Sequence, residues 1–210
     1  PGVLTKPEPL SLRLTRDLAG NLERVVINDF DEFDALHQAQ KDGRLPPQTH
    51  IEYADEQKTL LFDAFNLETP IDKALKKRVW LPCGGYLIFD FAEALTVIDV
   101  NSGKMVTGKS MEETALRVNL EAVKELARQL RLRDVGGIVI VDLIDMEKDK
   151  NRQAILAALK DAAKCDRMPV KIEGITRLGL LEMTRKRKGE QLRRALRTTC
   201  SVCSGSGELL

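Results

Sequence analysis

The chain has 210 residues, of which 43% are hydrophobic, and this is enough to bury a sizeable core in one large domain or two small ones. Its formal net charge is only +1, so overall charge points to no particular class of partner. Nothing at the amino terminus resembles a signal peptide and no apolar run is long enough to cross a bilayer, which predicts a cytoplasmic protein without a membrane segment.

The first part of the chain, about residues 1–65, is expected to play a structural role. Two short apolar runs, residues 10–14 and 24–27, are predicted to be strands. A helix is predicted from about residue 31 to 42, and a loop with two prolines follows it at residues 46–47.

A second unit is predicted to begin near residues 69–70, because a Thr-Pro pair is typical of a helix start. Residues 86–89 and 95–100 are predicted strands. The short segment between them, around residues 92–93, indicates a hairpin.

One long helix is predicted from about residue 110 to 133. Ser110 and Glu113 form a capping box at its start, and Gly136 and Gly137 follow its end. Its apolar residues recur at helical spacing, namely Leu116, Leu120, Val123, Ala127 and Leu130.

The segment after this helix, residues 137–142, is a predicted strand. A strand, a helix and a strand in this order favour a parallel pair joined by a right-handed crossover. Residues 155–162 then show helical spacing, and residues 170–172 form a short predicted strand. The fold class that follows is a mixed α/β layered fold.

Two aspartates at the ends of apolar strands, Asp99 and Asp142, are the most informative residues. Because side chains alternate along a strand, Asn101 shares the face of Asp99, and the crossover can bring both aspartates to one sheet edge. Carboxylates beside a core are costly unless they are paired, protonated or bound to a cation, so the pair predicts a divalent metal site for phosphate chemistry. Taken singly, each aspartate could simply be a turn former that ends its strand.

The chain has only two histidines, His37 and His50, and neither is near the aspartates in sequence. A bound divalent ion lowers the pKa of water and screens phosphate charge, so it removes the need for a histidine acid and base. The scarcity of histidine, together with the two aspartates, therefore favours hydrolysis by a metal-activated water.

A Cys-x-x-Cys pair, Cys200 and Cys203, precedes a Gly/Ser-rich tail and predicts a zinc site. Structural zinc takes four ligands and the chain has no second pair of this kind, so a second copy of the chain is the economical source of the other two. This predicts a homodimer that shares one zinc; a pair of exposed thiols without metal is the alternative. Cys83 and Cys165 are expected to be free thiols without a special role.

Basic residues crowd the segment 185–197, in which Glu190 is the only acid. Such a segment can neutralise the phosphates of a nucleic acid, or it can be a solvated helix face.

Several long motifs follow one another in the chain: residues 97–103, 112–115, 119–122, 127–134, 136–146 and 176–185, and then the cysteine pair. Together they closely resemble the ribonuclease E/G family, densely from about residue 80 to 207. The resemblance implies a magnesium-dependent endoribonuclease that cuts single-stranded RNA in RNA processing and decay, of both mRNA and rRNA. It also implies 5′-phosphate and 3′-hydroxyl products.

The resemblance also implies roles for individual residues. The aspartates that match Asp99 and Asp142 hold the catalytic magnesium, and the asparagine that matches Asn101 supports the first of them by a hydrogen bond. Arg177 and Arg185 lie in a family-like segment and are the predicted RNA contacts, although packing is an alternative explanation for both.

The cysteines that match Cys200 and Cys203 share one zinc between two chains of a homodimer. A homo-oligomer larger than a dimer is the alternative assembly. Residues 66–195 are expected to be a deoxyribonuclease-I-like catalytic subdomain. Residues 1–65 would then be the carboxy-terminal part of a ribonuclease-H-like subdomain, and residues 196–210 a zinc-link.

Two features of the family are not recognisable here, namely an oligonucleotide-binding barrel and a pocket that senses a 5′-monophosphate. Aromatic residues make up only 4% of the chain, too few for the stacking platforms of single-strand binders. A start at Pro1 indicates a processed chain or a piece of a longer one. We therefore expect weak RNA binding and low activity of this chain alone, and the alternative function is a non-catalytic zinc-linked module for RNA binding or assembly.

Overall fold

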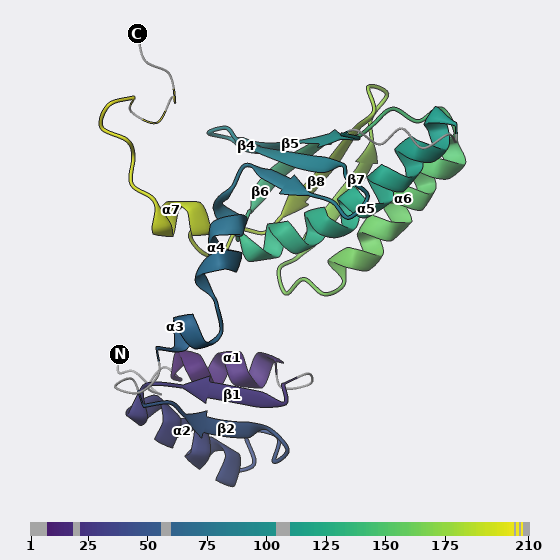
Figure 1. Ribbon diagram of the computed structural model, residues 1–210. Helices are drawn as coiled ribbons and strands as arrows, with labels where there is room; N and C mark the ends of the chain where they lie inside the picture. The colour runs from purple at the N-terminus through teal and green to yellow at the C-terminus, as the bar shows by residue number, and fades with distance from the viewer. Residues whose placement is uncertain are drawn as a thin grey trace, which may run out of the picture. The chain divides into compact units, whose positions relative to one another are not determined.

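The computed structural model describes residues 8–18, 22–55, 60–103, 110–203, 205 and 207. The chain forms two compact units, Pro1–Pro70 and Ile71–Leu210, which are both drawn in Figure 1. Among the described residues, no helix is both long and apolar enough to span a bilayer.

The first unit pairs two short parallel strands and packs helices on them. Its elements are α1 (Leu10–Leu18), β1 (Arg24–Ile27), α2 (Phe30–Lys41), β2 (His50–Tyr53) and α3 (Leu61–Ala64). Its small core consists of Leu12, Leu36, Ala39, Leu45 and Ile51. The predicted helix near residues 31–42 and the strand at residues 24–27 are confirmed.

The predicted strand at residues 10–14 is wrong, because this segment is helical. Its alternating leucines suggested a half-buried strand, but the structure buries Leu12 and Thr15, which are three residues apart. Leu10 and Leu14 are exposed. The buried side chains therefore follow the helical period, and the alternating leucines in the sequence do not reflect a strand.

The second unit is built on a six-stranded sheet in the order β3-β4-β5-β6-β8-β7. Its strands are β3 (Arg78–Trp80), β4 (Tyr86–Phe91), β5 (Leu95–Asn101), β6 (Gly137–Asp142), β7 (Val170–Ile175) and β8 (Leu180–Arg185). Among the described strands of this sheet, β5 and β6 pair in parallel and all other neighbours pair antiparallel. The mixed α/β class is thereby confirmed, as is the hairpin between β4 and β5.

Four helices accompany this sheet in the sequence: α4 (Glu68–Leu75), α5 (Met111–Leu132), α6 (Asp149–Ala163) and α7 (Leu192–Leu196). Helix α5 is the predicted crossover between the two parallel strands. Its N-cap residue Ser110 accepts a hydrogen bond from the backbone N–H of Glu113, as the capping box predicts.

The two faces of the sheet differ. Helices α5 and α6 lie side by side along one face (Figure 1), and they bury the strand residues that point toward them, such as Ile98, Val139 and Val141. The alternate residues point to the opposite face, where Val97 is 37% and Ile138 is 48% exposed. Asp99 and Asp142 belong to this second, exposed set.

Candidate active site

Asp99 and Asp142 are direct register partners on β5 and β6. Partner residues on neighbouring strands point to the same face, and adjacent strands lie about 4.8 Å apart, so the two carboxylates are neighbours. Asp99 is half-buried and Asp142 is exposed. The structure thus brings together two acids that are far apart in the sequence.

Asn101 lies two residues beyond Asp99 on the same strand and the same face. Its Nδ2 donates a hydrogen bond of 2.6 Å to Oδ2 of Asp99. This bond fixes the carboxylate and leaves Oδ1 as its other acceptor.

The chemistry of this pair suits a hard cation. Like charges directly opposite each other on neighbouring strands repel, and a divalent ion between them would remove the repulsion. Among the described residues, no group of three or more acids, histidines or cysteines is arranged so that it could hold a metal ion. Magnesium is commonly bound through one or two carboxylates, with waters and substrate phosphates completing its shell, so two carboxylates fit this ion.

Two glycines, Gly85 and Gly103, allow close backbone packing around the strand end that carries Asn101. A side chain at Gly85 would place its Cβ 2.7 Å from the carbonyl oxygen of Asn101. Gly103 has a φ of +64°, and a side chain there would meet the carbonyl of Gly84. The turn between β3 and β4 therefore packs directly on the end of β5, because both positions lack a Cβ.

The loop after Asp142 is fixed to helix α5 by Asn119. The buried Asn119 donates from Nδ2 to the carbonyl of Ile144 (2.8 Å) and accepts from the N–H of Ile144 (3.1 Å). One side chain thus satisfies both backbone groups of a residue that lies two positions beyond the carboxylate.

Glu112, in the first turn of α5, binds the next part of this loop. Its carboxylate accepts from the N–H of Glu147 (2.9 Å), the N–H of Lys148 (3.2 Å) and Nδ2 of Asn151 (2.5 Å). These hydrogen bonds, above all that from Glu147, lower the pKa of Glu112. The sequence placed Glu112 and Asn119 only within family-like motifs and assigned them no role.

Arg185 is buried, with 5% of its surface exposed. Its Nε donates to Oδ2 of Asp166 and its Nη1 to Oδ1 of Asp134, both at 2.8 Å. These hydrogen bonds raise its pKa against the opposing effect of burial. The structure therefore assigns Arg185 to packing between the sheet and the α5 and α6 ends, and it does not support an RNA contact by this side chain.

Arg177 lies close to the loop that follows Asp142. It lines a small cavity of about 100 Å³ together with Asp145 and Arg152. Because this loop begins directly after β6, Arg177 stays a candidate for an RNA phosphate near the two carboxylates.

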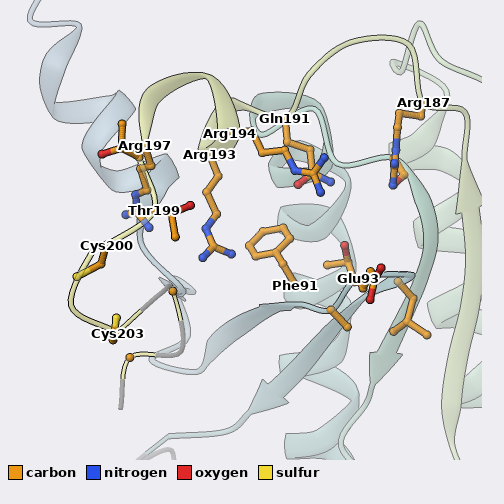
Figure 2. Close-up of a pocket in the computed structure, with 17 residues that line it drawn as sticks. Phe91, Glu93, Arg187, Gln191, Arg193, Arg194, Arg197, Thr199, Cys200 and Cys203 are labelled. Carbon is orange, nitrogen blue, oxygen red and sulfur yellow. The ribbon is translucent and has the colours of Figure 1, made fainter. Parts of the chain in front are cut away.

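A larger hollow of about 510 Å³ lies near the opposite ends of the parallel strands (Figure 2). Its basic lining comes from the arginine-rich segment, namely Arg187, Arg193, Arg194 and Arg197. Figure 2 shows Arg193 pointing toward Phe91, and its guanidinium carbon lies 5.4 Å from the centre of that ring. This gathering of guanidinium groups suits an anionic ligand such as an RNA backbone.

Cys200 and Cys203 line the same hollow. Cys200 is exposed and Cys203 is half-buried. Backbone N–H groups of Cys203 and Val202 hydrogen-bond to the thiol of Cys200 and lower its pKa. A lowered pKa favours the thiolate, which is the form that binds zinc, so the pair fits half of a tetrahedral site. Residues 204, 206 and 208–210 of the predicted zinc-link lie outside the described residues.

Comparison with known proteins identifies the family of the chain. The model of the Ribonuclease E/G family matches residues 1–188. The chain is 40% identical over 207 residues to ribonuclease G of Haemophilus influenzae, which covers 95% of this chain and 41% of that protein. It is 37% identical over 199 residues to ribonuclease G of Escherichia coli, covering 94% and 40%.

A third relative is ribonuclease E of a Nostoc species, which is 36% identical over 211 residues and is covered over 31% of its length. The chain spans about two fifths of the ribonuclease G relatives. Because the family model matches nearly all of the chain, the chain belongs to the ribonuclease E/G family.

Proposed function

We propose that this chain carries the catalytic carboxylates of a magnesium-dependent endoribonuclease, which cuts single-stranded RNA during RNA processing and decay in the cytoplasm. The observation that carries the proposal is the register pairing of Asp99 with Asp142 on one exposed face of the sheet. Membership of the ribonuclease E/G family supports the choice of RNA as substrate.

In this proposal the reaction is hydrolysis. The oxygen of a water molecule bonds to phosphorus and the P–O3′ bond breaks; O3′ takes a proton, which leaves a 3′-hydroxyl and a 5′-phosphate. Magnesium, when bound, supplies a water of lowered pKa and screens the phosphate charge. Asp99 and Asp142 would hold the ion, and Asn101 keeps the carboxylate of Asp99 in one orientation through its 2.6 Å hydrogen bond.

Cys200 and Cys203 have a separate role in this proposal. They provide two of the four thiolates of a structural zinc, and the same pair from a second copy of the chain completes the set. The lowered pKa of Cys200 supports this role. The result is a zinc-linked homodimer or a higher assembly of such dimers.

The test is single-turnover cleavage of an end-labelled single-stranded RNA, with the chain in excess. Asp99→Asn and Asp142→Asn should each abolish magnesium-dependent cleavage, because each removes a carboxylate from the pair. Asp90→Asn is the matched control, since Asp90 is an exposed aspartate on the same sheet that is paired with Lys77. Full activity in either of the first two variants would contradict the proposal.

The competing function is a non-catalytic zinc-linked module for RNA binding or assembly. The arginine-lined hollow next to the cysteine pair favours this reading. It predicts RNA binding that weakens in Arg193→Gln and Arg194→Gln, together with no cleavage in any divalent metal. Metal-dependent cleavage that both aspartate variants lose would exclude it.

A further inference from the structure

The chain's only tryptophan and one of its two tyrosines meet on the sheet. Trp80 on β3 and Tyr86 on β4 are register partners, and their rings are 5.1 Å apart in an edge arrangement. The guanidinium carbon of Arg78 lies 4.7 Å from the Tyr86 ring centre and 5.6 Å from that of Trp80. The low aromatic content predicted no stacking platform, yet the fold concentrates these aromatics in one place.

This cluster lies beside the two carboxylates. Tyr86 is also the register partner of Asn101, so it shares the face of Asn101 and Asp99. Tyr86 and Asp99 are therefore diagonal neighbours on adjacent strands, with Cα atoms about 7 to 8 Å apart. Trp80 lies one strand further out, about another 4.8 Å away.

Within the cluster, Tyr86 is half-buried, whereas Trp80 is unusually exposed for an aromatic side chain. Trp80 is 62% exposed, although an indole is among the largest apolar side chains and gains most from burial. Single-stranded RNA is commonly bound by stacking its unpaired bases on aromatic rings and on arginine planes. Arg78 adds a positive charge that attracts the phosphates flanking such a base.

We propose that Trp80, together with Tyr86 and Arg78, forms a stacking site for an unpaired base of the RNA, close to the phosphodiester that Asp99 and Asp142 engage. The inference rests on the proposed function and deepens it. The stacked base positions the backbone, because a short run of unstacked nucleotides spans the distance from Trp80 to the carboxylates. The occupant is a nucleobase of any type, since every base has a ring face that stacks.

Trp80 offers a direct test, because the intrinsic tryptophan fluorescence of the chain comes from this residue alone. A short single-stranded oligoribonucleotide is titrated into the chain with chelator present, so that binding is observed without cleavage. Stacking should quench Trp80 fluorescence. A series of the same oligonucleotide with one abasic position each should lose the quenching at one or two adjacent positions.

Variants separate stacking from folding. Trp80→Ala should weaken RNA affinity about fivefold to a hundredfold, whereas Trp80→Phe, which keeps an aromatic face, should stay within about threefold. Arg78→Gln should lower the slope of log affinity against log salt by about 0.7, the value for one phosphate contact to a single strand. Leu132→Ala is the control, because Leu132 is 47% exposed at the end of α5 and should leave affinity unchanged.

The outcomes distinguish this inference from the proposed function. Asp99→Asn should abolish cleavage while Trp80 quenching persists, and this result supports both. RNA that binds by anisotropy with unchanged Trp80 fluorescence, or quenching that no abasic position affects, overturns the stacking site and leaves the nuclease proposal standing. Quenching that rises with chain concentration in the absence of RNA would indicate a second copy of the chain on this surface, and would also overturn it.

Discussion

Asp99 and Asp142 stand directly opposite each other on neighbouring parallel strands, and both point to the face of the sheet that is not packed against α5 and α6. The backbone register thus places the two carboxylate groups next to each other. We expect this arrangement to cost stability in the absence of a cation, and this cost is one reason for proposing that a divalent ion binds between the two carboxylates.

The first prediction concerns this link between metal and stability. Added Mg²⁺ should raise the thermal unfolding temperature of the wild-type chain, since a ligand that binds only the folded state stabilises it. In metal-free buffer, Asp142→Asn should be as stable as wild type or more stable by up to about 1 kcal/mol, because the cross-strand repulsion is lost. The variant should not respond to Mg²⁺.

Urea unfolding and thermal melts with and without chelator measure both effects. Asp90→Asn should keep the response of the wild type, because the partner of Asp90 is Lys77, which directly precedes β3. A wild-type chain whose stability is indifferent to Mg²⁺ would contradict the two-carboxylate site.

The second prediction concerns Asn101. Removing its hydrogen bond in Asn101→Ala should leave the Asp99 carboxylate free to rotate. The loss of such a supporting partner commonly lowers metal affinity or activity about tenfold to a hundredfold. Cleavage rate against Mg²⁺ concentration is the measurement, and the expected signature is a higher Mg²⁺ requirement with partial recovery at saturation. An unchanged Mg²⁺ requirement would count against the supporting role.

The sequence predicted the elements around the carboxylates well, because several local signals agreed there. A capping box, a helical apolar period and two glycines defined the crossover helix, and the strand order then implied the parallel pairing that the structure shows. Alternation along β5 placed Asn101 on the face of Asp99, and the family resemblance implied a hydrogen bond between them, which the structure shows. Their roles in metal binding and catalysis stay predictions.

Contacts between residues far apart in the sequence could not be predicted from local sequence patterns. Arg185 stands at the start of a basic run, and only the folded sheet shows that Asp134 and Asp166 occupy its guanidinium. The aromatic cluster was missed for a similar reason, since composition does not tell which strands pair. Trp80 and Tyr86 meet only because β3 and β4 form a hairpin.

The third prediction follows from the burial of Arg185. In Arg185→Ala, Asp166 would keep a buried carboxylate without its partner, because only 5% of its side chain is exposed. We expect a loss of about 3 to 5 kcal/mol in the free energy of unfolding, the usual range for breaking a buried pair on one side. Urea unfolding at neutral pH measures it.

The neighbouring Lys186→Ala is the control for Arg185→Ala. Lys186 is exposed, and its substitution should change stability by no more than about 0.5 kcal/mol. Equal effects of the two substitutions would show that the ion pairs of Arg185 contribute little.

The fourth prediction is a pH dependence that arises from Glu112. Its folded-state pKa lies below the ordinary value of 4.5, so its contribution to stability is fully present above that value and is lost as the pH falls through the folded pKa. The loop after Asp142 should therefore loosen in acid. The protection factor of an amide is its intrinsic exchange rate at a given pH divided by the observed rate. For Glu147 and Lys148 this factor should fall as the pH drops below 4.5, and by more than it does for core amides of β6.

Glu112→Gln tests the cause of this effect. The variant keeps an oxygen acceptor but cannot titrate, so the protection factors of the two loop amides should already be lower at neutral pH and should not fall further in acid. A wild-type acid dependence that persists in this variant would assign the effect to another group.

The last prediction concerns the cysteine pair. In the metal-free chain, Cys200 should react with iodoacetamide faster than the exposed Cys165, because the N–H groups of Val202 and Cys203 lower its pKa and thereby increase its thiolate fraction. With zinc bound, that reactivity should disappear, and native mass measurement should find one zinc for two chains. Cys200→Ser should yield monomers without zinc, whereas Cys165→Ser should keep the dimer. One zinc for each monomer would contradict the shared site, because a single chain would then supply all of the ligands itself.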